Sequence, residues 1–270
     1  MEEQTLKAAD NAALANDLLA AATAPVEEED TRTKIVAPKD VLVDLPGGLV
    51  LGGEVIKTVE VKELTGKDEE VIVRNSNGGR MFSSILARGT VMIGDKAPTE
   101  DLLDRLLVGD RDAILLGVYR ATFGETADVA AWCDGCNDVK TVTVEVATDI
   151  KNKVLTDPLN DTVFEVKGKN HEYVVTLPTG VTQRKLMANP DLSVAESMTI
   201  LLEQTVLRID GRPVLSKVQV QDLGLADRRA ITEEIAKRTP GPQFDDLTVI
   251  CPDCESEVQV PISLGALFRF

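Results

Sequence analysis

Two parts of the chain repeat one another, and this internal repeat constrains the fold more than any other feature of the 270-residue sequence. The segment Leu106–Ile114 recurs as Leu223–Ile231 with five of nine positions identical. Other matches follow in the same order at offsets of 114 to 118 residues: Thr65-Gly66 with Thr179-Gly180, Ser84–Val91 with Thr199–Val206, and Cys133–Cys136 with Cys251–Cys254. Collinear matches at an almost constant offset indicate that the chain holds two copies of one supersecondary unit.

Each copy is expected to contain a β-hairpin, a Thr-Gly turn, two or three helices, a Cys-x-x-Cys turn and a closing strand. This order predicts an α+β protein with one unit over residues 40–150 and a second over 160–270, packed with pseudo-twofold symmetry. Residues 1–39 stand apart, with an Ala- and Leu-rich helix predicted over 5–22 before the acidic linker Glu27–Asp30. This stretch is either an unstructured tail or an arm that folds on a partner.

The hydrophobic pattern places the individual elements. Alternating side chains predict strands over 55–61 and 141–146, and a second hairpin is expected from Val163–Val166 and Tyr173–Leu177. Helical patterns cover residues 66–74, 79–93 and 99–122. The last of these helices begins after Thr99, a suitable N-cap, and a break at Gly109-Asp110 would make Asp110 a new cap.

All four cysteines lie in the two turns, Cys133-x-x-Cys136 and Cys251-x-x-Cys254. Pro, Asp and Gly between the cysteines favour a tight knuckle, and four thiolates make a closed tetrahedral Zn²⁺ site. Because 114 residues separate the knuckles, one shared structural Zn²⁺ would join the two units to each other. The alternatives are two local disulfides or free thiols, and a redox pair of the thioredoxin type. The redox pair is disfavoured, since each knuckle is expected to follow a helix and loop and to precede a strand, where no helix N-terminus lowers a thiol pKa.

Composition excludes several classes of function. The net charge of −16 opposes binding to phosphate backbones or anionic lipid, and 3% aromatic residues leave few platforms for stacking bases. No apolar run is long enough to cross a bilayer, and the acidic N-terminus lacks the basic start of a secretory signal. The single histidine, His171, is expected in an exposed turn, and the glycine-rich phosphate loops are missing. These features predict a soluble, intracellularly made protein.

Three further features have a structural and a functional interpretation. Asp110 and Asp227, each followed by arginine, are better explained as helix caps with nearby ion pairs than as a carboxylate pair for catalysis. Trp132 is expected to pack over the first knuckle. The C-terminal segment Leu264–Phe270, which ends in Phe-Arg-Phe, either enters the protein's own core or docks on another subunit.

Taken together, these motifs resemble the baseplate hub protein family of T-even-type contractile-tailed bacteriophages. The residues that carry the resemblance are Glu63–Glu70, Gly109–Leu115, Ala121–Gly124, the two cysteine knuckles and the closing segment Val249–Phe268. It covers residues 40–270 and leaves out the N-terminal arm. The chain departs from the family's Cys-Pro-x-Cys-Gly knuckle, because Gly135 precedes Cys136 and Glu255 stands where the family often has the glycine.

The resemblance implies a structural, non-catalytic protein of the virion tail baseplate, made in the host cytoplasm. Its partners would be other tail proteins, with several copies in a ring, and neither nucleic acid nor a membrane. The alternatives are a hub assembly chaperone that leaves the particle, a zinc-stabilised adaptor unrelated to phages, and a Cys-x-x-Cys oxidoreductase.

Overall fold

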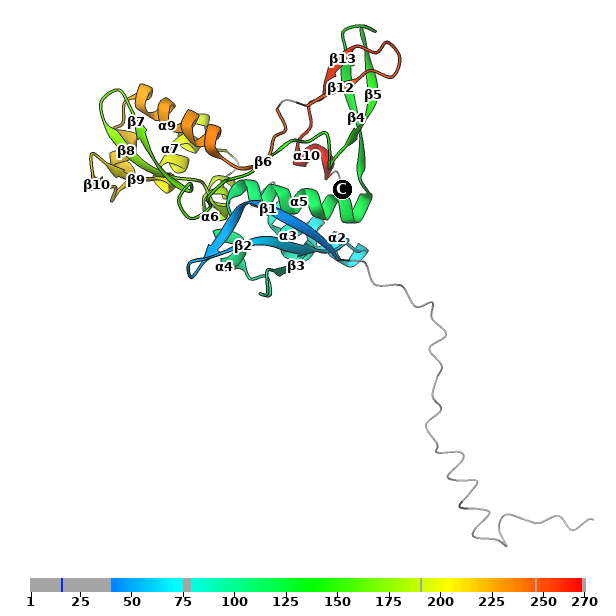
Figure 1. The fold of residues 1–270 in the computed structure, drawn as a ribbon, viewed down its shortest axis with the longest axis horizontal. Coiled ribbons are helices and arrows are strands. Elements are labelled where there is room, and N and C mark those ends of the chain that lie inside the picture. The colour runs from blue at the N-terminus through cyan, green and yellow to red at the C-terminus, as the bar shows by residue number, and fades with distance from the viewer. Residues whose placement is uncertain (1–15, 17–39, 75–78, 190, 246, 269–270) are drawn as a thin grey trace, which may run out of the picture. The chain divides into compact units, whose positions relative to one another are not determined.

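The computed structural model describes residues 40–74, 79–189, 191–245 and 247–268, together with Asn16 (Figure 1). Among these residues the fold is mixed α and β, with helices α2–α10 and five small antiparallel sheets. The predicted helix over 5–22 and the acidic linker lie outside the described residues, apart from Asn16, which is helical. None of the described helices is long and apolar enough to cross a membrane.

The first half of the chain packs a three-stranded sheet against helices. Its strands are β1 (Val41–Leu51), β2 (Glu54–Val61) and β3 (Thr90–Ile93), hydrogen-bonded in the order β1-β2-β3. Its helices are α2 (Gly66–Arg74), α3 (Gly79–Gly89), α4 (Glu100–Arg105) and α5 (Val108–Phe123). Gly52 and Gly53 turn the chain between β1 and β2 with positive φ angles of 58° and 89°, which glycine adopts without strain. Helix α5 is buried over most of its length, because β1, β2 and α3 all contact it.

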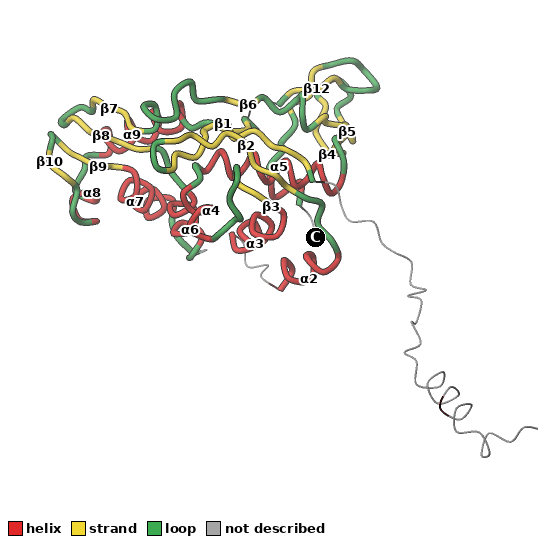
Figure 2. Tube along the Cα trace, turned by 60° about the horizontal axis from the view of Figure 1, so that its bottom comes forward, coloured by secondary structure: helices red, strands yellow, loops and turns green. Residues whose placement is uncertain are grey.

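The second half repeats this arrangement around a four-stranded sheet of order β10-β9-β8-β7. Its strands are β7 (Val163–Lys167), β8 (Glu172–Thr176), β9 (Val206–Ile209) and β10 (Arg212–Pro213). Its helices are α6 (Gly180–Met187), α7 (Val194–Thr205), α8 (Lys217–Gln221) and α9 (Leu225–Arg238). Figure 2 shows α3, α4, α6 and α7 following one another along one side of the strands.

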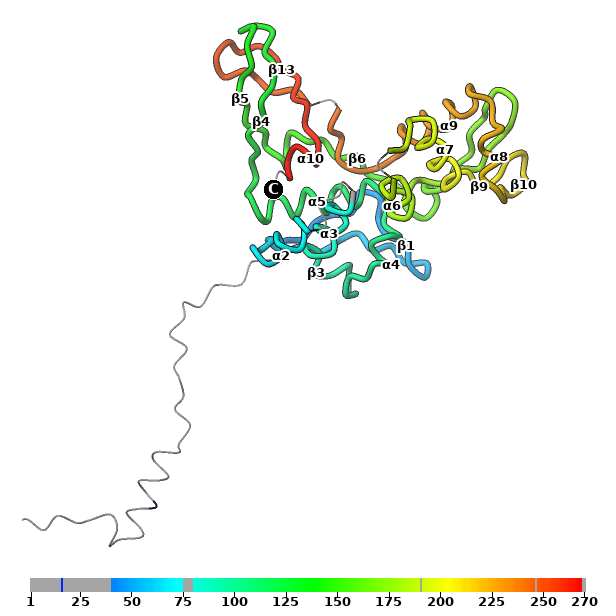
Figure 3. Tube along the Cα trace, turned by 180° about the vertical axis from the view of Figure 1, so that it is seen from behind, coloured from blue at the N-terminus to red at the C-terminus, as the bar shows by residue number. Residues whose placement is uncertain are grey.

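Two hairpins carry the cysteines. The first is β4 (Thr126–Cys133) with β5 (Asp138–Glu145), and the second is β12 (Thr248–Ile250) with β13 (Glu257–Gln259). Strand β13 contacts β4, so hairpins more than 100 residues apart lie side by side (Figure 3). The remaining elements are β6 (Asn152–Lys153), which pairs with β11 (Gly241–Pro242), and α10 (Leu264–Leu267), which contacts α5.

The two halves share their order of elements and a detail of strand register. Each half runs through a hairpin, two helices, a strand, two further helices and a cysteine hairpin. The β2–β3 pairing shifts register between Glu60 and Val61, and the β8–β9 pairing shifts between Val174 and Val175, 114 residues later. Pseudo-twofold packing of two units is not confirmed, because α6 of the second half contacts α3, α4 and α5 of the first, which are not its equivalents.

Two apolar clusters form the interior. One combines β1–β3 and α2–α5 with both cysteine hairpins, so residues 247–268 pack with the first half of the chain. The other lies among β7–β9 and α7–α9 around Tyr173, Leu202 and Ile231. Phe268 is buried in the first cluster with its ring edge-on to Tyr119 at 5.8 Å, so the C-terminal segment enters the protein's own core.

Three local predictions are corrected. The predicted helix over 79–93 ends at Gly89, because Thr90–Ile93 pairs with β2 as strand β3. The helix over 99–122 breaks at Leu106 and Leu107, whose ψ angles of 142° and 151° are extended, instead of at Gly109-Asp110. Each cysteine knuckle closes a β-hairpin, the first after β4 and the second after β12, and neither directly follows a helix and loop.

Candidate metal centre

The four cysteines that the sequence predicts as metal ligands come together at the turns of the two hairpins. Their sulfur atoms all lie within 4.8 Å of one another. Across the hairpins, the Sγ atoms of Cys133 and Cys254 are 3.4 Å apart, and those of Cys136 and Cys251 are 3.8 Å apart. A tetrahedral ion with metal–sulfur bonds of about 2.3 Å needs sulfur atoms about 3.8 Å apart. The donor set therefore has the composition and spacing to hold one thiophilic ion.

The backbone conformation of the knuckles shows what the departures from the Cys-Pro-x-Cys-Gly pattern cost. The residue after each second cysteine, Asn137 or Glu255, has a left-handed φ of 52° or 59°, the conformation in which glycine is unstrained. Asparagine tolerates this region, whereas the left-handed backbone at glutamate costs about 1 kcal/mol of conformational free energy. Gly135 is required for a different reason, since a Cβ there would lie 2.5 Å from Ser256 Oγ and 2.8 Å from Cys254 Sγ. The close approach of the two knuckles thus depends on glycine at position 135.

Neighbouring groups set the protonation of the thiols. The Ser256 hydroxyl, followed by its backbone amide, donates to Cys254 and lowers the pKa of this thiol to about 6. The Cys254 thiol and then burial raise the pKa of Cys136 to about 12. Four crowded thiols therefore resist ionising together, and a divalent cation would remove that repulsion and release protons on binding.

A lysine joins the two knuckles outside the sulfur cluster. Lys140 Nζ, on β5, lies 2.9 Å from Asp253 Oδ2 in the second knuckle and 3.4 Å from Asp138 Oδ2 in the first. These carboxylates raise the pKa of Lys140 and keep it charged beside the thiol cluster. Trp132 contacts the first knuckle. Its ring is half-exposed, and its Nε1 donates to Asp134 Oδ1 at 3.0 Å.

Asp227 binds another segment instead of capping its own helix, which corrects the prediction, whereas Asp110 does both, because the amide of Leu107, the N-cap residue of α5, also lowers the pKa of Asp110. Asp110 Oδ1 accepts from the Gly47 amide at 2.6 Å, and burial raises the pKa of Asp110 to about 6. Asp227 accepts from two backbone amides of the β7–β8 turn and from the Tyr173 hydroxyl at 2.8 Å. Burial opposes ionisation of Asp227, but these donors outweigh it and hold its pKa below the ordinary value.

The arginines that follow the aspartates make equivalent backbone contacts. Arg111 Nη1 donates to the Leu103 carbonyl at 2.8 Å, and Arg228 Nη1 donates to the Val220 carbonyl at 3.4 Å, in each case eight residues upstream. Arg111 also forms the predicted ion pair, with Asp104 at 3.8 Å. Arg228 instead donates to the Thr199 hydroxyl at 2.8 Å. The Asp-Arg motif therefore positions helices in both halves.

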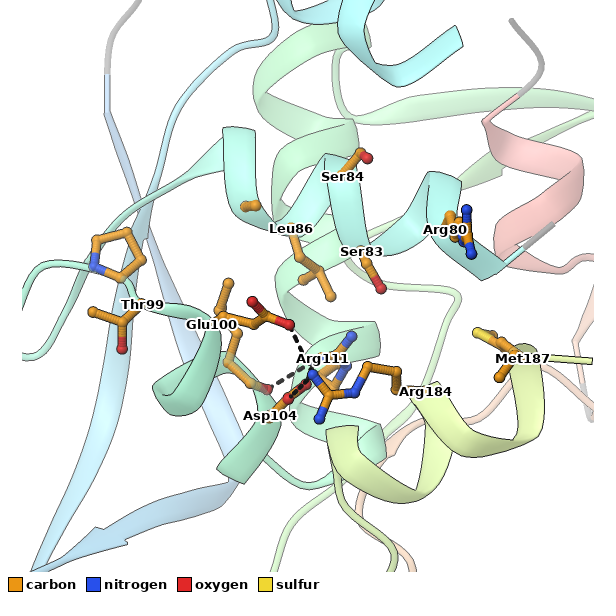
Figure 4. Close-up of a pocket in the computed structure, with 14 residues that line it drawn as sticks. Arg80, Ser83, Ser84, Leu86, Thr99, Glu100, Asp104, Arg111, Arg184 and Met187 are labelled. Carbon is orange, nitrogen blue, oxygen red and sulfur yellow. Dashed lines mark hydrogen bonds and ion pairs between the residues drawn. The ribbon is translucent and has the colours of Figure 1, made fainter. Parts of the chain in front are cut away.

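The other candidate residues show no arrangement for nucleophilic catalysis. His171 lies in an exposed turn as predicted, with Nδ1 2.7 Å from Asp210 Oδ2. A cavity of about 730 Å³ lies among α3, α4, α5 and α6 (Figure 4). Part of its wall is an ion-pair network in which Arg184 lies 2.7 Å from both Glu100 and Asp104. The residues that line the cavity include neither histidine nor cysteine.

Sequence reasoning found the cysteines but missed Ser256 and Lys140. Ser256 carried a usable signal, because it stands two residues after Cys254, within reach of its thiol. Lys140 carried none, since its partner Asp253 is more than 100 residues away. No protein-family model, no curated protein and no solved structure matches the chain.

Proposed function

We propose that the four cysteines hold one structural Zn²⁺ that joins the two halves of the chain. The carrying observation is the all-sulfur cluster itself, with two ligands from each of two distant hairpins within 4.8 Å. Four thiolates are the donor set typical of closed zinc sites, and they leave no coordination position for water or substrate. The ion would contribute folding free energy and hold residues 247–268 against the first half, which supports a structural role over an enzymatic one.

Metal analysis of the purified chain tests this proposal. One zinc per chain is expected, and Cys133→Ser or Cys251→Ser should each abolish stoichiometric binding, because both knuckles serve one ion. The control is Ser256→Ala, which removes a donor to Cys254 and keeps all four ligands. This variant should retain zinc with an affinity reduced by about 10-fold or more. Two ions per chain, or full zinc after loss of one cysteine from either knuckle, would rule out the shared site.

We infer further that the chain is an internally duplicated structural component of a bacteriophage tail baseplate hub, which holds other tail proteins through protein–protein contacts. The support is the motif resemblance, together with the positions those motifs occupy. Thr65-Gly66 begins helix α2, Gly109–Leu115 lies within buried α5, and the knuckles carry the sulfur cluster. The buried α5 motif and the knuckles serve packing, and none of these positions is arranged for catalysis, as expected of a subunit that binds other proteins.

Quantitative mass spectrometry of purified phage particles and of infected-cell lysate tests the assignment. A fixed ratio to known tail proteins within the particle is the expected result. Presence in lysate alone would overturn the structural role in favour of an assembly chaperone. Absence from both samples would overturn the phage assignment and favour a zinc-stabilised adaptor.

A further inference from the structure

The two halves of the chain meet through a contact between segments that are not equivalent. In the first half, the link between α4 and α5 is extended and pairs with the start of α6 in the second half. The Gly180 amide donates to the Leu106 carbonyl at 2.9 Å, and the Val108 amide donates to the Pro178 carbonyl at 3.0 Å. We call Leu106–Gly109 with Arg111 the link face, and Pro178–Arg184 with Gly241 the start face.

Side chains reinforce this contact. Arg111 Nε donates to Gln183 Oε1 at 2.7 Å, and Arg184 Nη1 lies 2.7 Å from Glu100 Oε1 (Figure 4). Gly180 lets the backbones approach, because a Cβ there would lie 2.8 Å from Asp104 Cα. Gly241 packs directly against Gly109 in the same way. The first half thus contributes its link face, and the second half its start face.

The repeat places an equivalent link face on the second half, and that face is open. It comprises Leu223–Ala226 with Arg228, 117 residues after the first. Leu107 and Gly109 are buried, whereas their equivalents Gly224 and Ala226 are exposed. Leu225 is 83% exposed, and as the first residue of α9 its amide has no acceptor within the helix. The Nε atom of buried Arg228 has no hydrogen-bond partner, although the equivalent atom of Arg111 is satisfied by Gln183.

An equivalent start face on the first half is also open. It comprises Leu64–Glu70 with Gly124, and the Leu64 amide donates to Thr122 Oγ1 at 3.1 Å, which holds its two segments together. Thr65 and Gly66 are exposed, whereas Gly180 is buried. A Cβ built at Gly66 or at Gly124 meets no atom within 4 Å. Within the part of the chain that the structure describes, one link face and one start face therefore stay unused.

Exposed charges on the unused start face and beside the unused link face, where Lys217 begins α8, are complementary. Glu70 occupies the position equivalent to Arg184, and Lys217 the position equivalent to Glu100, so the ion pair of the internal contact recurs with its signs exchanged. Glu69 is equivalent to Gln183 and adds a second acidic side chain to the start face of the first half. Glu69, Glu70 and Lys217 are all exposed.

We propose that the chain associates head-to-tail with further copies of itself, the start face of one chain binding the link face of the next. The occupant is a second copy because the same contact exists inside the chain and because exposed Glu70 complements exposed Lys217. A contact between two different faces is heterologous, so it closes into a ring or extends as a filament. The inference rests on the proposed duplication and is independent of the metal and of the phage assignment.

A charge-exchange experiment tests the contact by light scattering coupled to size-exclusion chromatography. The wild-type chain is expected to exceed the monomer mass of 29.1 kDa, either as a fixed ring or increasingly with concentration. Glu70→Lys and Lys217→Glu should each return the chain to a monomer, since like charges across the contact weaken it by about 100-fold. The double variant, and an equimolar mixture of the two single variants, should recover the wild-type assembly.

Matched controls are Glu165→Lys on β7 and Lys57→Glu on β2, which make the same charge changes on exposed positions away from both faces. Both should assemble like the wild type, and all variants should keep the wild-type circular dichroism and metal content. A wild-type chain that stays monomeric at all concentrations would overturn the proposal. So would single variants that still assemble, or a double variant that fails to recover assembly. None of these results would alter the expected zinc content or the particle analysis.

Discussion

The buried carboxyl of Asp110 should make the stability of this chain fall as the pH rises, and Asp110→Asn should remove its share of that dependence, to which Asp112 also contributes because burial raises the pKa of Asp112 to about 6. Burial raises the pKa of Asp110 from 3.8 to about 6, although the Gly47 amide donates to one of its oxygens. Its other oxygen, Oδ2, is buried without a hydrogen-bond partner. A neutral carboxyl fits this site better than a carboxylate, because an unpartnered carboxylate oxygen is costly to bury.

The sign and size follow from linkage. A carboxyl whose pKa is raised in the folded state contributes stability below 3.8, and this contribution is lost as the pH rises through about 6. The difference of about 2 pH units corresponds to about 3 kcal/mol. The free energy of unfolding of Asp110→Asn, minus that of the wild type, should therefore increase by about 2.5 kcal/mol between pH 4 and pH 7.5, because at pH 4 a small part of the contribution is already lost.

Urea unfolding followed by circular dichroism at a series of pH values measures this difference. The ionisation of the cysteines and of other groups cancels in this difference, because both chains carry the same groups. Any constant cost of the asparagine shifts the difference by the same amount at every pH and leaves its change with pH unaffected. Asp227→Asn is the matched control. The lowered pKa of Asp227 means that its stabilising contribution is complete above about pH 5, so this variant should cost about 2 kcal/mol without further change to pH 7.5. A difference curve for Asp110→Asn that stays flat from pH 4 to pH 7.5 would refute the argument.

Three further substitutions test the packing. Gly180→Ala places a Cβ 2.8 Å from Asp104 Cα and should lower the free energy of unfolding in urea by about 2 kcal/mol. Gly66→Ala meets open space and should be nearly neutral. Equal effects of the two substitutions would contradict the close contact at Gly180. Glu255→Gly relieves the strain of the left-handed φ of 59° and should raise the free energy of unfolding by about 1 kcal/mol. The measurement is the Tm at equal metal content, which should rise. A lower Tm would show that the backbone strain is not the dominant effect. Phe268→Ala should cost about 3 kcal/mol, because the ring is only 2% exposed, and an unchanged Tm would place it outside the core.

The sequence could predict those features that recur in both halves. The Cys-x-x-Cys pairs and the Thr-Gly helix starts appear twice in collinear order, so their grouping followed from the repeat alone. The strand over 55–61 and the helix over 66–74 also match the structure, since both carry a clear local pattern. The residue pattern within each of these short elements is enough to predict it, without any contact to a distant part of the chain.

Features that depend on distant partners could not be predicted. The break at Leu106 and Leu107 has no local signal, because leucine is a strong helix former, and it arises from pairing with Pro178 and Gly180. Asp110 has the sequence context of a helix cap, but one of its oxygens also accepts from an amide 63 residues away. At Leu106 and Leu107 a tertiary contact outweighs a local preference worth about 1 kcal/mol.

The proposed duplication and the proposed contact between chains together account for the different charges at equivalent positions of the two halves. If both contacts used the same signs, the start face of a second chain could compete for the internal link face and open the chain. With the signs exchanged, Glu70 of a neighbour would be repelled by Glu100, and Arg184 by Lys217, while the correct pairings remain attractive. The charge pattern thus keeps the internal contact and the proposed external contact from interchanging. A structural ion at the cysteine knuckles would add to this, because it binds the end of the second half to the core of the first and so holds the internal contact closed.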